Sequence, residues 1–220
     1  MDYLLTEEQK MVRELSRKIA EEKIKPVAAK YDQTEEYPWD MIKVIADAGL
    51  FGLFIPEEYG GMTLSVLNLC IATEELSRAC GGIAVCYAAS ALGTFPILLF
   101  GNEEQKKKYL PDLASGKKIA AFGITEPEAG SDASAIKTTA KKEGDCYILN
   151  GLKHFITNGG DAQIYVVIVM TDKTRGPRGA SAFIVEKGTP GFSFGKKEEK
   201  LGIRASSTRE LILWIVKFPK

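Results

Sequence analysis

Residues 121–132 read Ala-Phe-Gly-Ile-Thr-Glu-Pro-Glu-Ala-Gly-Ser-Asp, the most informative stretch of the chain. An apolar extended run passes into a Thr-Glu-Pro turn and then into Gly-Ser-Asp. A tight turn of this kind exposes backbone N–H groups and hydroxyls together, and Gly130 lets a ligand approach the main chain closely. The stretch predicts a strand that ends in a polar turn, suited to a planar, phosphate-bearing cofactor.

A second stretch, residues 150–160, has the same character and reads Asn-Gly-Leu-Lys-His-Phe-Ile-Thr-Asn-Gly-Gly. Each residue of the two stretches also has an ordinary structural interpretation. Phe122, Ile124 and Ile156 fit the core of a sheet. The hydroxyls of Thr125 and Thr157 can bond to the backbone. The ordered occurrence of both stretches favours a cofactor site over a plain core.

For four other polar residues of these stretches we prefer an ordinary structural role to a catalytic one. Asp132 is expected to cap a turn or helix. Glu126 and Glu128 are expected to be turn and surface residues. His154 should alternate away from Phe155 along the strand and be exposed.

The chain on either side of residue 116 follows two different patterns. Before it, helical spacing and caps dominate: Thr6 and Gln9 form a capping box, and Asn102 caps a later helix. After it, short β-prone runs alternate with turns, at 119–124, 136–141, 146–149, 154–157, 164–171, 182–186 and 210–218. We predict an α+β fold, with an all-α domain over residues 1–116 and a β domain of barrel or sandwich type over 117–220.

The composition disfavours several classes of function. Lys and Arg together number 29, as do Asp and Glu, so the net charge gives no argument for a nucleic-acid partner. The four cysteines lack a Cys-x-x-Cys pair and the only histidine is His154, so a metal site lacks ligands. Gly-x-Ser-x-Gly, Gly-x-Gly-x-x-Gly and the P-loop pattern are all absent. Reduced thiols fit a reducing compartment.

One segment could suggest a membrane. Residues 81–101 carry no charge, but Gly93, Thr94 and Pro96 interrupt the run. A spanning helix needs about 20 mostly apolar residues, so we favour a buried helix of a soluble bundle over a membrane span. Met1–Gln9 has early acids and lacks the pattern of a signal peptide.

The two stretches closely resemble the acyl-CoA dehydrogenase family. The matching segments cover most of the chain, from about residue 4 to about 212, at 5–9, 55–61, 122–132, 138–140, 144–153, 155–159 and 201–211. The resemblance implies a flavoprotein with an N-terminal helical domain and a middle β domain that binds FAD and acyl-CoA.

The resemblance also implies roles for single residues. Phe122, Ile124 and Thr125 match positions that line and hydrogen-bond the isoalloxazine ring. Gly130 and Ser131 match the turn that meets the cofactor phosphates, and Ser131 also matches a contact to the CoA thioester substrate. Phe155 matches the aromatic residue beside the flavin, often Trp in relatives, with Ile156 supporting it. Thr157 matches the hydroxyl near flavin N5. Donors at this edge favour the electron-rich reduced ring.

The implied activity is α,β-dehydrogenation of an acyl-CoA thioester, with hydride transfer to FAD N5 and an electron-transfer flavoprotein as acceptor. The family also implies a homo-oligomer, a tetramer in complete members, in the bacterial cytoplasm or the mitochondrial matrix. An acyl-CoA oxidase or flavin monooxygenase on the same scaffold is an alternative. A non-catalytic fragment that binds FAD or a partner is another.

The chain departs from the family at its end. Relatives continue into a second helical domain that carries the catalytic glutamate and most of the tetramer interface, so we expect no catalytic residue before Lys220. The six apolar residues 211–216 would form an aggregation-prone edge if nothing covered them. We expect a partner chain, a dimer mate or a further domain to cover them.

Overall fold

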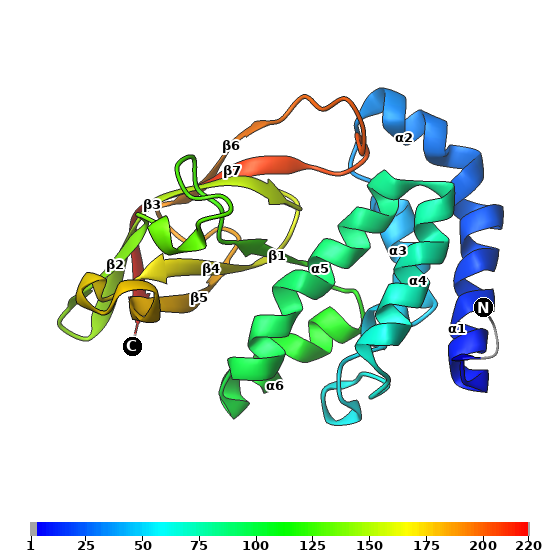
Figure 1. Ribbon diagram of the computed structural model, residues 1–220, viewed down its shortest axis with the longest axis horizontal. Coiled ribbons are helices and arrows are strands. Elements are labelled where there is room, and N and C mark those ends of the chain that lie inside the picture. Colours follow the sequence, from blue (N-terminus) through cyan, green and yellow to red (C-terminus); the bar gives the residue numbers. More distant parts are fainter. Residues whose placement is uncertain (1–3, 220) are drawn as a thin grey trace. The chain divides into compact units, whose positions relative to one another are not determined.

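The computed structural model describes residues 4–219, and of Pro219 the backbone only (Figure 1). It divides the chain into two compact units. The helical unit comprises the chain up to Ile119 together with Glu199–Ser206, and the strand unit comprises Ala120–Glu198 together with the chain from Ser207. The predicted lack of a signal sequence rests partly on Met1–Tyr3, which lie outside the described residues.

The helical unit confirms the all-α prediction for the first half of the chain. Its α-helices are α1 (Glu7–Ile19), α2 (Ala28–Thr34), α3 (Trp39–Asp47), α4 (Val66–Ala79), α5 (Gly81–Phe100) and α6 (Glu103–Ala114). A π-helical turn (Ala20–Ile24) and a 3-10 turn (Lys25–Val27) join α1 to α2. Both predicted caps form: Thr6 and Gln9 exchange two hydrogen bonds before α1, and Asn102 and Gln105 do so before α6.

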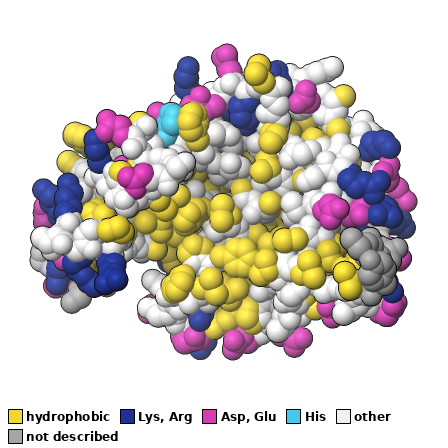
Figure 2. Space-filling model, in the orientation of Figure 1, with side chains coloured by type: hydrophobic (Ala, Val, Ile, Leu, Met, Phe, Trp, Pro, Cys, Tyr) yellow, Lys and Arg dark blue, Asp and Glu magenta, His cyan; other side chains and the backbone are white. Residues whose placement is uncertain are grey.

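Helix α5 is the uncharged segment noted in the sequence. By length and composition it could cross a membrane, and it is the one such helix in the described part of the chain. About half of its most apolar window, 56%, is buried inside the protein. Leu92, Leu99 and Phe100 stay exposed, and hydrophobic side chains gather on the face that Figure 2 shows. The sequence-based preference for a buried helix stays a prediction.

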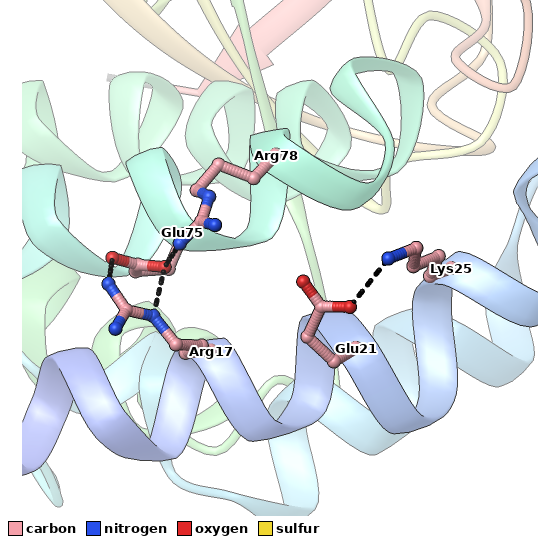
Figure 3. Close-up of polar contacts among 5 residues, drawn as sticks. All are labelled: Arg17, Glu21, Lys25, Glu75 and Arg78. Carbon is pink, nitrogen blue, oxygen red and sulfur yellow. Dashed lines mark hydrogen bonds and ion pairs between the residues drawn. The ribbon is translucent and has the colours of Figure 1, made fainter.

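A charged network joins α1 to α4 (Figure 3). The carboxylate of Glu75, 5% exposed, accepts two hydrogen bonds from Arg17, at 3.0 and 2.7 Å, and one from Arg78 at 2.9 Å. The bond from Arg17 is the main reason why the pKa of Glu75 lies below its ordinary value, although burial opposes the shift. Nearby, Lys25 pairs with Glu21 at 2.8 Å.

The lowered pKa of Glu75 predicts an acid-sensitive helical unit. A carboxyl with a lower pKa in the folded state adds stability above its unfolded pKa, here about 4.5, and that stability is lost as the pH falls through the folded value. Replacing Glu75 by Gln should therefore reduce the drop in Tm between about pH 7 and about pH 3.5. Thermal scans of both proteins across this range test it, and equal drops would contradict it.

The strand unit is one seven-stranded mixed sheet in the order β1-β4-β2-β3-β7-β6, with β5 paired to β4. Strand β1 runs parallel to β4, and β2 contacts β4 in the same sense, whereas the other pairs are antiparallel. The strands are β1 (Ala120–Gly123), β2 (Thr139–Glu143), β3 (Cys146–Thr157), β4 (Ile164–Met170), β5 (Ala180–Glu186), β6 (Phe192–Lys197) and β7 (Thr208–Pro219).

The sheet curls so that edge strand β1 meets the end of β3. The His154 N–H donates to the Thr125 carbonyl at 2.8 Å, and the Asn158 side-chain amide donates to the Ala120 carbonyl at 3.2 Å. Residues late in β3 thus lie beside residues early in β1, and the two segments run antiparallel. The result is a half-barrel, which confirms the predicted α+β fold class.

Two features of the sheet differ from the sequence-based expectation. The runs 146–149 and 154–157 form the single strand β3, and β6 was not predicted because Gly195 and two lysines dilute its apolar pattern. Strand β6 pairs with β7 on the side away from β3. Leu211, Ile212 and Leu213 therefore lie on no free edge, whereas the expectation that another chain or domain covers the rest of the run 211–216 stays a prediction. Trp214 and Ile215 remain exposed.

The connection from β6 to β7 belongs to the helical unit. Arg204 pairs with Glu35 at 2.7 Å and donates to the Asp32 carbonyl at 2.8 Å. A β-carbon placed on Gly82 would lie 2.9 Å from the β-carbon of Ala205, so a glycine is required there. The helical unit is therefore built from two separate segments of the sequence.

Candidate functional site

The first half of the candidate site is the end of β1. A β-carbon on Gly123 would meet the Leu211 side chain at 3.0 Å, so this position faces the inside of the half-barrel. Because side chains alternate along a strand, Phe122 and Ile124 project from the opposite face. Both are half-buried, as is Thr125 beyond the strand.

The second half is a β-bulge in β3. Lys153 pairs with Leu211 and Ile156 pairs with Arg209, so two residues of β3 stand opposite one residue of β7. Phe155, the second of the two, has φ of 56°, a left-handed conformation that is uncommon for an aromatic residue. Bulges of this kind re-aim side chains and are frequent beside active sites.

The bulge decides where the side chains of β3 point. Phe155 is 58% exposed, Ile156 is buried and Thr157 is half-buried. His154 does not alternate away from Phe155 as expected, because the left-handed residue breaks the alternation. The two rings lie 3.8 Å apart between centroids, and His154 Nδ1 lies 3.1 Å from Glu210 Oε1. His154 is half-buried rather than exposed.

The turn that follows β1 is open to solvent. The backbones of Glu126 and Ala129 exchange hydrogen bonds of 3.0 and 3.1 Å, which closes the turn. Gly130 and Ser131 beyond it are exposed, and a β-carbon placed on Gly130 would meet nothing within 4 Å. Asp132 accepts a hydrogen bond from the Ser134 N–H at the start of a short 3-10 helix, which confirms its expected capping role.

Three hydroxyls of the candidate site are unused. Among residues 4–219, no side chain or backbone group hydrogen-bonds to the hydroxyl of Thr125, Ser131 or Thr157. The interpretation of the two threonines as backbone-bonded strand hydroxyls therefore does not hold in this structure. A hydroxyl can donate one hydrogen bond and accept two, so all three are available to a ligand.

Sequence reasoning missed a buried ion pair of the strand unit. Glu126, expected at the surface, is 6% exposed, and Lys153 is fully buried. Lys153 Nζ lies 2.7 Å from Glu126 Oε1 and 3.1 Å from the Ile124 carbonyl. The sequence contained one indication of this burial. Side chains alternate along a strand, so Lys153 falls on the same side of β3 as Leu149, which is buried.

Further bonds complete this buried ion pair. Glu126 also accepts the backbone N–H of Lys137 at 2.6 Å and of Thr138 at 3.0 Å. Burial by itself would raise the pKa of Glu126, but the bonds from Lys153, Thr138 and Lys137 outweigh it and the pKa lies below its ordinary value. Burial lowers the pKa of Lys153, and Glu126 opposes this only in part.

The described residues contain no group of three or more His, Cys, Asp or Glu side chains that could hold a metal ion. The arrangement offers instead an exposed aromatic ring, half-buried apolar side chains and unpaired hydroxyls around an open turn. Such a surface suits an organic ligand with a flat ring and polar edges.

Comparison with known proteins places the chain in a family. Residues 6–117 match the sequence profile of the acyl-CoA dehydrogenase N-terminal domain, and residues 121–215 match that of the middle domain. Together the two matches cover almost the whole chain. The protein belongs to the acyl-CoA dehydrogenase family.

Individual relatives are similar over the full chain. A short-chain-specific acyl-CoA dehydrogenase of Clostridium acetobutylicum is 51% identical over 96% of this chain, which spans 56% of that relative. A chain in the structure of the electron transferring flavoprotein of Acidaminococcus fermentans is 48% identical, with a TM-score of 0.96, and is 58% covered. A Bacillus anthracis acyl-CoA dehydrogenase in complex with FAD is 40% identical over 100% of this chain, with a TM-score of 0.90, and is 38% covered. The chain thus spans little more than half the length of the curated relative.

Proposed function

We propose that these residues form the FAD-binding and acyl-CoA-binding part of a flavin-dependent acyl-CoA dehydrogenase. The observation that carries the proposal is the pairing of two strand ends, one with the strained, exposed Phe155 and the other with the open turn after Thr125. Membership of the family and the similarity to an FAD complex support the choice of cofactor.

Each residue of the site has a proposed task. Phe122, Ile124 and Thr125 line one edge of the isoalloxazine ring, and Phe155 packs beside it. Buried Ile156 supports the strand behind Phe155. When bound, FAD supplies the acceptor for the hydride that leaves the β-carbon of an acyl-CoA.

The unpaired hydroxyls give the site its polarity. Thr125 and Thr157 donate hydrogen bonds to the ring edge, where donors favour the reduced cofactor. The open space at Gly130 admits the phosphates to the main chain, and Ser131 hydrogen-bonds either the phosphates or the thioester ligand. Half-buried hydroxyls are suited to this task because a bound ring excludes water from them and strengthens the bonds.

The proposal assigns removal of the α-proton to a residue outside this sequence. Within residues 4–219, Glu126 is the only buried carboxylate near the site, and it is unsuited to act as a base. It already accepts bonds from Lys153, Lys137 and Thr138, and its pKa is lowered. A general base works best with a pKa near the working pH.

The wider setting of the protein is also proposed. A short-chain acyl-CoA is the first substrate to test, because the Clostridium acetobutylicum relative is described as short-chain specific. An electron-transfer flavoprotein is the proposed acceptor and a homo-oligomer the proposed assembly. Relatives from bacteria and from mitochondria support a location in the cytoplasm or the mitochondrial matrix.

One experiment separates this function from its rivals. The purified chain is mixed with FAD, scanned for flavin absorbance, and then assayed with butyryl-CoA and a redox dye. We expect a yellow protein without turnover, since the base lies elsewhere. Colourless protein would contradict the proposal, turnover would show that the base is misassigned, and oxygen consumption without dye would favour an oxidase.

Replacing Thr157 by Val tests the assignment of the ring edge. The change removes one hydroxyl at constant shape and should lower the flavin reduction potential, because a donor to the reduced ring is lost. The loss of one hydrogen bond to a charged ring, about 1.5–3 kcal/mol, corresponds to a shift of tens of millivolts. Spectroelectrochemistry of the FAD-bound proteins measures it, and an unchanged potential would remove Thr157 from the site.

A further inference from the structure

The Lys153–Glu126 ion pair lies between the two halves of the site. Lys153 precedes the bulge in β3, and Glu126 follows Thr125 at the end of β1. Three bonds join the halves: Lys153 Nζ to the Ile124 carbonyl, Lys153 Nζ to Glu126 Oε1, and the His154 N–H to the Thr125 carbonyl.

These bonds fix the backbone on either side of the proposed ring contacts. The carbonyl of Ile124 is bound by Lys153 at 3.1 Å, and that of Thr125 by His154 at 2.8 Å. The peptide groups before and after the Thr125 side chain are therefore both held in place. The same contacts fix β3 up to the residue before Phe155.

Phe155 needs such support more than its neighbours do. A non-glycine residue in the left-handed region costs roughly 1–3 kcal/mol and persists only where the surroundings over-determine it. The Lys153 and His154 contacts hold the chain before it, and the ladder with β7 resumes at Ile156 after it. The backbone is therefore held by hydrogen bonds both before and after the strained residue Phe155.

Glu126 also ties in a third segment. Its two oxygens accept the N–H groups of Lys137 and Thr138, which lead into β2. An apolar pair in the same space could fill the volume but could not bind the Ile124 carbonyl and the two N–H groups. Buried ion pairs add little to stability compared with apolar replacements, so stability alone does not account for this pair.

We propose that Glu126 and Lys153 are positioning residues that hold Thr125 and Phe155 in the geometry the flavin ring requires. The inference rests on the proposed function. Neither residue touches the cofactor, since Lys153 is fully buried and Glu126 nearly so. Misplacement of a binding group by about 1 Å is enough to cost a large factor in function.

The test compares three variants with the unaltered chain: Lys153→Met, the double variant Lys153→Met with Glu126→Gln, and Glu75→Gln as control. Glu75 is a buried carboxylate of the helical unit, 5% exposed, with arginine partners of its own. It matches Glu126 in burial and pairing but lies outside the site. FAD affinity is measured by titration, and hydrogen exchange of the His154 amide is measured without FAD.

We expect both Lys153 variants to bind FAD about tenfold more weakly and to exchange the His154 amide about tenfold faster. The double variant removes the unpaired charge, so it should regain stability without regaining FAD affinity. The Glu75→Gln control should lose stability yet bind FAD as the unaltered chain does.

Three results would contradict these expectations. Unaltered FAD affinity in the double variant would overturn the inference and leave the pair a folding element only. Unaltered exchange at His154 would overturn it as well. If the unaltered chain itself binds no FAD, the proposed function fails and the positioning role falls with it, whatever the exchange data show about the backbone.

Discussion

Replacing Lys153 by methionine is expected to lower the free energy of unfolding of the strand unit by about 3–5 kcal/mol, the usual effect of breaking a buried ion pair. The change removes the cation but leaves Glu126 buried and charged. Two backbone N–H groups still bind that carboxylate, but the strong bond at 2.7 Å is lost. The Ile124 carbonyl loses its partner too, and an unpaired buried acceptor adds to the cost.

Urea unfolding of the two proteins measures this effect, with Lys43→Met as the control. Lys43 pairs with Asp47 at 2.7 Å on the surface of α3, where both side chains are largely exposed. An exposed pair of this spacing contributes about 0.3–0.5 kcal/mol. If Lys153→Met cost no more than Lys43→Met, the buried pair would not be the structural tie that its geometry indicates.

Replacing Phe155 by glycine is expected to weaken FAD binding strongly while changing the free energy of unfolding only slightly. Stacking of an aromatic side chain on a flat base is worth about 1–3 kcal/mol, so FAD affinity should fall about 10- to 100-fold. The free energy of unfolding should change by less than about 1 kcal/mol. Glycine relieves roughly 1–2 kcal/mol of left-handed strain, which offsets the lost ring contact with His154 and the greater entropy of the unfolded chain.

Phe155→Trp is the matched control, because it keeps a flat aromatic ring at the same backbone position. It should bind FAD within a few-fold of the unaltered chain, whereas the glycine variant should not. Isothermal titration gives the affinities and urea unfolding the stabilities. Equal affinities for all three proteins would show that Phe155 does not contact the cofactor. A large loss of stability in Phe155→Gly would show that the ring belongs to the core.

Much of the fold could be predicted from local signals. The capping boxes at Thr6 and Asn102 are contiguous in sequence, so their hydrogen bonds follow directly from residue types and spacing. The change from helical to alternating patterns near residue 116 likewise gave the fold class. Strand β6 could not be predicted, because its apolar residues are few and its pairing with β7 is what makes it a strand.

The candidate site could be predicted only in part. Its residues lie in two contiguous stretches, and the residue types in these stretches were enough to predict a cofactor site. The bulge at Phe155 could not be predicted, because it depends on the register between β3 and β7. The partner of Lys153 could not be predicted either. Glu126 lies 27 positions away, and the two meet only because the sheet curls until β1 reaches β3.

If the two strand ends together hold a flavin, the protein must bind FAD and be stabilised by it. The purified chain is titrated with FAD while flavin absorbance and Tm are recorded together. We expect bound, yellow protein and a rise in Tm, since ligand at 100 times Kd adds about 2.7 kcal/mol of stability. The Phe155→Gly protein should show a smaller rise at the same FAD concentration. Unchanged Tm and unbound flavin at saturating FAD would contradict the claim.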